Sequence, residues 1–291
     1  MIILYLKVIQ INILMSVVVD TANYIGDGWT IGNHFFQIAN GYAFAKKTGR
    51  KLILPRHNLH PEYEHYSKQY VYNDWYASWS QYVDDIPTGQ LAKYKEPCYS
   101  FREIQNAHYH TIMLEGYFQS SKYFASCKDE IRSLFRPTEE IKQNCLNKWG
   151  HLMSGENLVL VHARQTDYLK PQNIEIHNPL PPSYYHNAFE EIMKRVANPF
   201  FVLVSDDPSY WDSVKIPGHH TCINEPNSAI TLYFMTHFKN YIIANSSFAW
   251  WGAFLSKHHE PLVLAPEKWF GPAGVQDYQD IFEPEWIKVS Q

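Results

Sequence analysis

Short apolar runs alternate with helical segments through the second half of the chain. Strands are predicted at 157–164, 200–207, 221–224, 241–245 and 261–266, and helices at 181–197, 228–238 and 247–256. Strands that are apolar along their whole length are typical of a parallel sheet covered by helices on both faces. The pattern therefore predicts an α/β domain over residues 151–291.

The first half of the chain carries a shorter version of the same pattern. Strands are predicted at 16–20, 51–55 and 110–118, and helices at 33–47, 119–135 and 138–149. Residues 61–83 are aromatic and polar without clear periodicity, so we interpret them as an insertion or a binding edge. Residues 1–150 thus form a second α/β domain. Two such domains would enclose a cleft, and ligands of open α/β sheets bind at the carboxyl ends of the strands.

The apolar N-terminus, residues 1–19, is interrupted by Lys7, Gln10, Asn12 and Ser16. A membrane-spanning helix needs about 20 consecutive apolar residues, and a secretory signal needs a basic start and a small-residue cleavage site. We therefore favour one or two buried strands over a signal anchor of the Golgi or endoplasmic reticulum. Met15 directly precedes a strand, so it is also a candidate second start site, with residues 1–14 dispensable.

Composition narrows the class of partner. The 291 residues carry 29 acidic and 25 basic side chains, which argues against a nucleic acid partner because the basic excess that coats phosphates is missing. Aromatic residues make up 16% of the chain, and aromatic faces serve cores as well as stacking on sugars and bases. The four cysteines show no CxxC spacing, so we expect free thiols and a cytoplasmic protein, with association at the cytoplasmic face of a membrane left open.

Polar side chains follow three consecutive strands of the second half. They are His162, Arg164 and Asp167 after the first, Ser205, Asp206 and Asp207 after the second, and Asn245, Ser246, Ser247 and Phe248 where the third runs into a helix. Arginine has a planar fork that fits phosphate oxygens, and the free N–H groups of a helix start attract anions. We expect this set to converge on the cleft. Asp207 also fits a helix N-cap followed by proline, so a structural role stays open for it.

A glycine-bearing loop, GDGWTIGN at 26–33, joins the first strand to its helix. Its spacing is GxGxxxG rather than GxGxxG, and Arg56 rather than an acid follows the next strand, so an NAD(P) oxidoreductase is a poor alternative. We expect the loop to bring backbone close to a ligand, with Gly28, Gly32 and Asn33 facing the cleft from the first domain. No metal-ligating cluster is convincing, so no metal cofactor is expected.

Four segments resemble the α-1,2-fucosyltransferase family, glycosyltransferase family 11, and more distantly the α-1,6- and protein O-fucosyltransferases. They are GWTIGNHFFQIANGYAFAKKTGR, LEGYFQSSKYF, VHARQTDYL, and FVLVSDDP together with KNYIIANSSFAWWGAFLS. The resemblance runs from about Asp20 to Phe270. It implies a two-domain GT-B fold, an inverting and metal-independent mechanism, GDP-β-L-fucose as donor and a galactoside-type oligosaccharide as acceptor.

The resemblance also implies roles for the residues of these motifs. Arg164 would bind the β-phosphate, His162 would support the diphosphate, and Ser246 and Ser247 would hold phosphate at the helix start. The acids of the SDD segment would stabilise the nucleotide pocket. The candidates for the general base are Asp20, Asp27, His34 and Glu115, and we place Asp27 with Arg164 and His162 in the catalytic set.

Three positions depart from the family pattern. Gln165 stands at the second arginine of HxRRxD, His34 at the glutamine of GNQ, and Thr231 at an acid that in relatives helps to read guanosine. Two alternatives therefore stay open beside a galactoside 2-α-L-fucosyltransferase. One is a family member that uses another nucleotide-sugar donor, and the other is a non-catalytic module that binds glycan or nucleotide.

Overall fold

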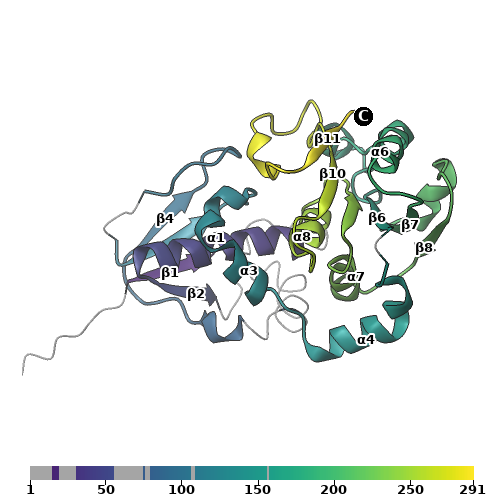
Figure 1. The fold of residues 1–291 in the computed structure, drawn as a ribbon. Helices are drawn as coiled ribbons and strands as arrows, with labels where there is room; N and C mark the ends of the chain where they lie inside the picture. Colours follow the sequence, from purple (N-terminus) through teal and green to yellow (C-terminus); the bar gives the residue numbers. More distant parts are fainter. Residues whose placement is uncertain (1–14, 20–30, 56–74, 76–78, 106–108, 156) are drawn as a thin grey trace, which may run out of the picture.

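Two parallel sheets with covering helices lie side by side in the computed structural model, which describes residues 15–19, 31–55, 75, 79–105, 109–155 and 157–291 (Figure 1). The first sheet has the order β3-β2-β1-β5-β4. Its strands are β1 (Ser16–Val19), β2 (Lys51–Pro55), β3 (Val83–Asp84), β4 (Leu91–Lys95) and β5 (Thr111–Glu115). All its strand pairs are parallel, which confirms the predicted α/β class for this half.

The second sheet has the order β11-β10-β9-β6-β7-β8 and is also parallel throughout. Its strands are β6 (Leu158–Ala163), β7 (Phe200–Ser205), β8 (His220–Ile223), β9 (Asn240–Ile242), β10 (Leu262–Pro266) and β11 (Ile287–Val289). Side chains alternate between its faces: Val159 and Val161 pack on the side of α6 (Pro182–Met193), whereas Leu160 packs on the side of α7 (Ser228–Met235) and α8 (Ser247–Phe254). The central strands are therefore buried on both faces.

The two halves are joined by an aromatic seam between α1 (Ile31–Thr48) and α8, which meet at the middle of the molecule (Figure 1). The ring centroids of Phe36 and Trp250 lie 4.5 Å apart, and those of Phe35 and Trp251 lie 5.4 Å apart. All four side chains are fully buried, and one apolar cluster runs through both sheets. The seam thus closes part of the expected cleft in the described part of the chain.

The sheets divide between β5 and β6, but other elements cross that division. The helix α4 (Glu139–Trp149) precedes β6 and packs against α7 of the second half. Near the C-terminus, Asp277 accepts a hydrogen bond from the N–H of Ser100 at 3.2 Å, and Asp280 pairs with Lys122 of the first half. The domain boundary at residue 150 stays a prediction.

Several elements differ from those predicted. The strands β3, β4 and β11 and the short helix α5 (Ile174–His177) were not expected, and the predicted helix at 119–135 is a 3₁₀ segment (Ser121–Cys127) followed by α3 (Lys128–Leu134). The interpretation of 61–83 as an insertion or binding edge is wrong for Trp75 and Trp79. Both indoles are buried, because Trp75 packs on Phe35 and Trp79 packs on Phe135.

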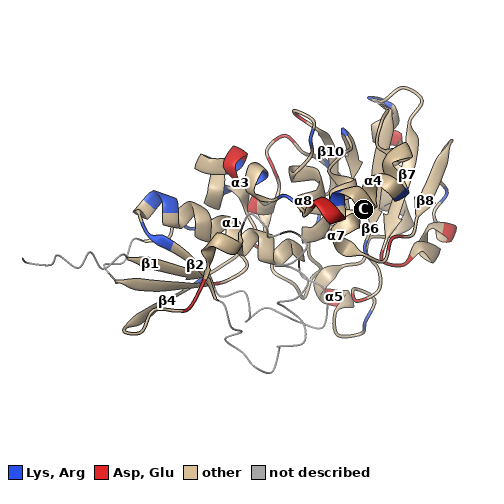
Figure 2. Cartoon of the chain, turned by 90° about the horizontal axis from the view of Figure 1, so that it is seen from below, with Lys and Arg blue, Asp and Glu red and all other residues tan. Residues whose placement is uncertain are grey.

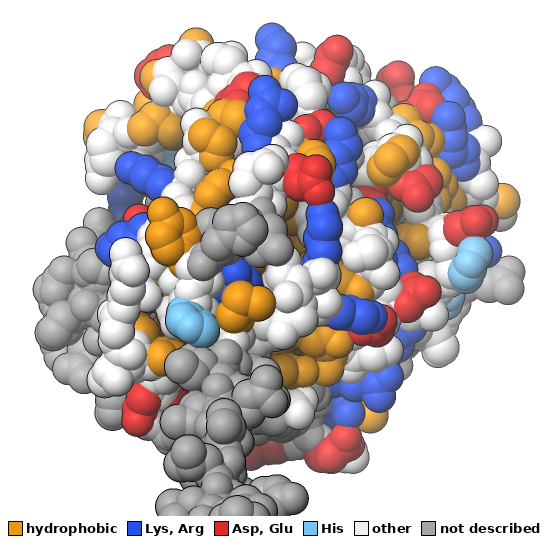
Figure 3. Space-filling view, turned by 90° about the vertical axis from the view of Figure 1, so that its left-hand side faces the viewer, with side chains coloured by type: hydrophobic (Ala, Val, Ile, Leu, Met, Phe, Trp, Pro, Cys, Tyr) orange, Lys and Arg blue, Asp and Glu red, His pale blue; other side chains and the backbone are white. Residues whose placement is uncertain are grey.

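The expectations for residues 1–14 and for most of 61–78 fall outside the described residues. In the described part of the chain, no helix is both long and apolar enough to cross a membrane. The four cysteines, Cys98, Cys127, Cys145 and Cys222, are free thiols, as predicted. On the face shown in Figure 3, basic and acidic side chains are interspersed. Ion pairs such as Lys46–Glu130 and Lys47–Glu103 join opposite charges on the described surface.

The basic residues of α1 lie at its C-terminal end. Lys46 and Lys47 lie in its last turn, where basic groups complement the helix dipole, and Figure 2 shows this basic end at the side of α1 away from α8. Within the described helices, neither α1 nor α8 has an acidic residue in its first turn. The starts of both helices therefore keep their positive dipole ends uncompensated by their own side chains.

Candidate functional site

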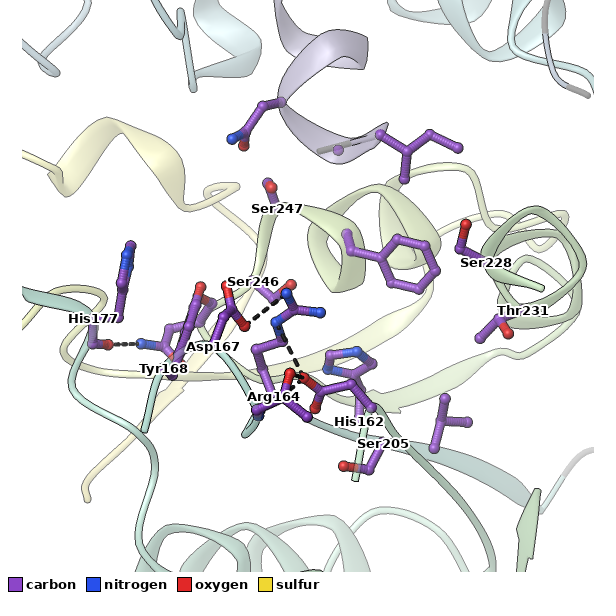
Figure 4. Close-up of a pocket in the computed structure, with 18 of the residues that line it drawn as sticks. His162, Arg164, Asp167, Tyr168, His177, Ser205, Ser228, Thr231, Ser246 and Ser247 are labelled. Carbon is purple, nitrogen blue, oxygen red and sulfur yellow. Dashed lines mark hydrogen bonds and ion pairs between the residues drawn. The ribbon is translucent and has the colours of Figure 1, made fainter. Parts of the chain in front are cut away.

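A pocket of about 750 Å³ lies where the seam opens, at the carboxyl ends of β6 and β7 and the starts of α1, α7 and α8 (Figure 4). Most of the predicted site residues line it: Gly32, Asn33, His162, Arg164, Asp167, Ser205, Asp206, Asn245, Ser246, Ser247 and Phe248. Asp27 and Gly28 lie outside the described residues. The expected convergence of the three strand ends is thus present, and the volume suits a ligand of nucleotide size.

Arg164 occupies the middle of the pocket and is held there by two carboxylates (Figure 4). One guanidinium nitrogen lies 2.7 Å from Asp167, another lies 3.4 Å from Asp206, and the side chain is 22% exposed. Asp206 also accepts hydrogen bonds from the N–H groups of Gln165 at 2.8 Å and Thr166 at 3.1 Å. Asp206 therefore fixes the loop that carries Arg164, which pre-orients the cation toward an anion in the pocket.

Asp207 takes a structural position. Its carboxylate accepts from the N–H of Ser209 at 3.1 Å and caps the 3₁₀ turn Pro208–Ser213, with proline at the first position. The N-cap interpretation is confirmed, and among the described residues that line the pocket Asp207 is missing. Its predicted role in nucleotide binding finds no support in this placement.

His162 is a buried, neutral imidazole beside Arg164. It is 4% exposed, and burial lowers its pKa to about 4, helped by the positive charge of Arg164 and opposed by Asp206. Its Nδ1 has no hydrogen-bond partner in the part of the chain that the structure describes. That nitrogen has almost no accessible surface, so His162 borders the pocket as a ring whose burial disfavours a positive charge.

The starts of α1 and α8 touch one another at the pocket. A Cβ built on Gly32 of α1 would lie 2.5 Å from the carbonyl carbon of Ser247 and 2.6 Å from the nitrogen of Phe248. Ser246 is the N-cap residue of α8, and its side chain makes no capping hydrogen bond to the described backbone. Two positive helix ends, one from each half, therefore face the same space as Arg164, which favours an anion there.

Asn245 acts as a tie between loops. Its side-chain Nδ2 donates to the carbonyl of Trp269 at 2.9 Å and to that of His177 at 2.5 Å, and the residue is 2% exposed. These two bonds fix the segment after β10 and the end of α5 against the start of α8. The side-chain amide of Asn245, which was predicted to bind nucleotide, thus donates its hydrogen bonds within the protein and positions the pocket wall.

The positions that depart from the family pattern have clear placements. Gln165, which stands where the family has a second arginine, is 3% exposed and is absent from the described lining of the pocket. This position therefore belongs to the buried interior. Thr231 lines the pocket, and its hydroxyl donates to the carbonyl of Asn227 at 3.1 Å. Glu225, which the sequence analysis missed, lies beside it, but its carboxylate is bound to Lys148 at 3.0 Å. This end of the pocket presents hydroxyl and backbone groups.

Two of the four candidate general bases, His34 and Glu115, lie in the described part of the chain. Asp20 and Asp27 lie outside the described residues. His34 is 5% exposed, Glu115 is paired with Lys93 at 2.7 Å, and neither is in the described lining of the pocket. Among the described residues, no group of three or more His, Cys, Asp or Glu side chains could hold a metal ion.

The carboxylate of Glu96, directly after β4, holds the loop after β5, and the sequence analysis did not identify it. One oxygen of Glu96 accepts from the N–H groups of Tyr117 at 2.7 Å and Phe118 at 2.9 Å, and Phe118 adopts a positive φ of 52°. Burial raises the pKa of Glu96 to about 7 against these hydrogen bonds, with Asp277 adding to the rise. Glu96 is therefore protonated in the folded protein at pH values where it is ionised in the unfolded chain.

The Glu96→Gln variant is expected to gain stability over the wild type as pH rises from about 4.5 to 7. In this window the folded state keeps a proton that the unfolded state has lost, so the wild type loses stability with pH whereas glutamine, which also accepts both N–H groups, does not. The difference should change by roughly 2–3 kcal/mol. Urea unfolding of both proteins at pH 5 and pH 8 measures it, and an unchanged difference would contradict the prediction.

Comparison with known proteins is consistent with this geometry. The family model described as Glycosyl transferase family 11 matches residues 29–290. The O-antigen biosynthesis glycosyltransferase WbnK of Escherichia coli is 30% identical over 172 residues, about half of either protein (54% of this chain, 55% of WbnK). The alpha-1,2-colitosyltransferase of Escherichia coli is 25% identical over 285 residues, which cover 90% of this chain and 96% of that protein.

Solved structures share the fold. Fucosyltransferase NodZ from Bradyrhizobium has a TM-score of 0.53 at 13% identity, over 84% of this chain and 93% of NodZ. NodZ alpha-1,6-fucosyltransferase co-crystallised with GDP has a TM-score of 0.55 at 13% identity, with the same coverage of both chains. The predicted GT-B fold is confirmed.

Proposed function

Because the chain belongs to glycosyltransferase family 11, it is a glycosyltransferase, and we propose that it moves L-fucose from GDP-β-L-fucose to a galactose hydroxyl of a glycan, in α-1,2 linkage. One observation carries this proposal: Arg164 and the starts of α1 and α8 face one pocket of about 750 Å³. The NodZ structures with GDP and soaked with GDP-fucose support the same donor class.

The proposed reaction is an inverting displacement. The acceptor oxygen forms a bond to the anomeric carbon while the bond from that carbon to the β-phosphate oxygen breaks, and GDP leaves with the electron pair. The charge that develops on the leaving diphosphate is stabilised by Arg164 and by the N–H groups at the starts of the two helices. In this proposal these groups replace a metal ion.

The acceptor proton must go to a base. We propose Asp27, which precedes α1 in the sequence and lies outside the described residues. The described carboxylates of the pocket are already engaged: Asp167 and Asp206 with Arg164, and Glu225 with Lys148. One ring nitrogen of His162 has no partner among the described residues, but burial lowers the pKa of His162 to about 4, so it is a weak base.

Another sugar donor is the second candidate. The colitosyltransferase of Escherichia coli matches 90% of this chain, and Thr231 stands where relatives of the family have an acid. A neutral hydroxyl forms a weaker bond to the guanine N–H groups than a carboxylate does. We therefore propose that the sugar is fucose or a colitose-type sugar and that guanosine is recognised mostly through backbone groups near the start of α7.

Nucleotide binding tests the donor. In calorimetric titrations with GDP, UDP and ADP, we expect GDP to bind at least about tenfold more tightly, since the pocket is proposed to read guanine. Mass spectrometry of reactions with GDP-fucose then detects transfer or hydrolysis. A protein that binds glycans but none of the three nucleotides would contradict the proposal and support a lectin-like module.

A further inference from the structure

Arg164 by itself does not give the pocket an excess of positive charge. Its guanidinium pairs with the carboxylates of Asp167 and Asp206, so the three side chains together carry one more negative charge than positive. The starts of α1 and α8 add about half a positive charge each, which brings the total close to zero. A diphosphate carries several negative charges, so its binding in this pocket requires a further cation.

One lysine meets this need by its position. Apart from Arg164, Lys170 is the only lysine or arginine in the described lining of the pocket, and it is half-buried there. Its ammonium group forms no hydrogen bond or ion pair with any described residue. Lys148 beneath the other end of the pocket differs, because it is paired with Glu225 at 3.0 Å. Lys170 therefore keeps its positive charge available for a ligand of the pocket.

The backbone after Arg164 turns back and brings Lys170 close to the ion pair of Arg164. The N–H of Leu169 donates to the carbonyl of Gln165 at 3.0 Å, which closes a first turn. The N–H of Lys170 donates to the carbonyl of Asp167 at 3.3 Å, and the carboxylate of Asp167 lies 2.7 Å from Arg164. The side chain of Leu169 is 50% exposed, whereas that of Lys170 lines the pocket. The flexible four-carbon stem of Lys170 thus starts one turn away from the Arg164 ion pair.

Hydrogen bonds fix the segment that carries Lys170 to the rest of the pocket wall. The carbonyl of Lys170 accepts from the N–H of Asn173 at 2.8 Å, and the side-chain Nδ2 of Asn173 donates to the carbonyl of Asp167 at 2.8 Å. The hydroxyl of Tyr168 donates to the carbonyl of Asn245 at 2.9 Å, directly before the N-cap residue of α8. The backbone of Lys170 is therefore in place before a ligand arrives, so only its side chain has to be ordered on binding.

The position of Lys170 along the pocket indicates which phosphate it meets. Thr231 lies on one side of Arg164, and Tyr168 and His177 lie on the other (Figure 4). Lys170 comes between Tyr168 and His177 in the sequence, so it belongs to their end of the pocket. The proposed function, on which this inference rests, puts guanine at the Thr231 end. The β-phosphate is farther from guanine than the α-phosphate is, and it therefore lies nearer to Lys170.

We propose that Lys170 is a catalytic residue that binds the β-phosphate of the sugar nucleotide and stabilises the leaving diphosphate. When the bond from the anomeric carbon to the β-phosphate oxygen breaks, the electron pair stays on that oxygen. The ammonium group of Lys170 donates a hydrogen bond to the β-phosphate and offsets part of the new charge. Arg164 and Lys170 then supply the two positive side chains of the described pocket lining, one of them paired with acids and one not.

Calorimetric titrations of the full chain with GDP, GMP and inorganic pyrophosphate test this proposal. Lys170→Gln is expected to weaken the binding of GDP and pyrophosphate by about tenfold or more, because a charge-assisted hydrogen bond is lost, and to leave GMP binding unchanged. Lys170→Arg keeps the charge and should retain most of the GDP affinity. Lys215→Gln makes the same change at an exposed lysine outside the described pocket lining and serves as the matched control.

Thermal unfolding and transfer assays on the same variants complete the test. The unfolding temperature of Lys170→Gln should equal that of the wild type, because its ammonium group has no ion pair with a described residue to lose. With GDP-fucose, kcat should fall by roughly 10²-fold, the lower end of the usual loss for one charge-stabilising donor.

The outcomes separate this proposal from the proposed donor. A Lys170→Gln protein that binds GDP and pyrophosphate as the wild type does would overturn the role of Lys170. Equal losses of GDP and GMP affinity would overturn its placement on the β-phosphate, as would a lower unfolding temperature with loss of all three ligands. If the wild type prefers UDP to GDP and its UDP binding depends on Lys170, the proposed reading of guanine is refuted and the phosphate site at Lys170 stands.

Discussion

Replacing Arg164 with alanine is expected to lower the rate of sugar transfer by roughly 10²–10³-fold, the usual loss for one charge-stabilising donor. The guanidinium is the cation at the centre of the pocket, beside the start of α8 (Figure 4). Its removal also leaves the carboxylates of Asp167 and Asp206 without the ion pairs that they form with Arg164 in the wild type. These two carboxylates would then repel a diphosphate, so we expect GDP affinity to fall along with the rate.

Two further variants make this result specific to the guanidinium. Arg164→Lys keeps the charge but loses the planar fork, so its activity should lie between those of the alanine variant and the wild type. Arg136→Ala removes an exposed arginine from the segment after α3 and should leave transfer unchanged. Steady-state transfer, GDP calorimetry and thermal unfolding are measured for all three. Near-normal turnover of a folded Arg164→Ala protein would remove Arg164 from the mechanism.

The central strands were predictable because each is buried on both faces. β6 (LVLVHA) and β7 (FFVLVS) each open with an apolar run, and such a run is typical of a strand in a parallel sheet that is covered on both faces. Edge strands carry a weaker signal. β4 has the sequence LAKYK, and Lys93 and Lys95 suit an edge that must resist pairing with other chains, so no apolar run marks it. β3 is only two residues long.

Burial of the two tryptophans could not be predicted from their neighbours. Trp75 and Trp79 lie in a polar, aromatic stretch without periodicity, and local pattern favoured an exposed role. Tertiary contacts decide otherwise: Trp75 donates from its indole N–H to the carbonyl of Ala229 in the second half, at 3.3 Å. Contacts between residues more than 150 positions apart leave no periodic trace in the sequence.

In the site, too, local sequence pattern predicted some features, whereas contacts between distant residues decided others. Residues at strand ends were predictable as a group, because the carboxyl ends of parallel strands always meet at one edge of a sheet. The ring contacts of Tyr99 with Tyr117 and Phe270 beside the pocket were not, since these residues come from separate loops that only the packing of the two halves brings together. The ion pairs that Arg164 forms with Asp167 and Asp206 could not be predicted either, although both acids were named as site residues.

Gly32→Ala is expected to lower the rate of transfer by about 10²-fold and to destabilise the protein, although alanine is the better helix former. Gly32 lies in the first turn of α1, where alanine in place of glycine should by itself stabilise the helix by up to about 1 kcal/mol. Its new Cβ, however, would lie 2.5 Å from the carbonyl carbon of Ser247 and 2.6 Å from the nitrogen of Phe248. These are backbone atoms of α8, so no side-chain rotation can relieve the clash.

The overlap must be relieved by moving the start of α1 away from the start of α8. Overpacking of this kind costs roughly 1–3 kcal/mol. The shift would also separate the two helix ends proposed to hold the diphosphate and would loosen the pocket around Arg164. A displacement of about 1 Å in such a site is enough to cost on the order of 10² in rate. Loss of GDP affinity should therefore accompany the loss of stability.

Gly150→Ala is the matched control for this substitution. Gly150 also lies at a helix end, with φ −55° and ψ −32°, and no described atom lies within 4 Å of its Cβ position. Alanine there should be neutral or slightly stabilising, with unchanged transfer. Urea unfolding, GDP calorimetry and transfer assays on both variants decide the matter. If Gly32→Ala were as stable and as active as Gly150→Ala, the close contact between the two helix starts would have no part in binding the donor.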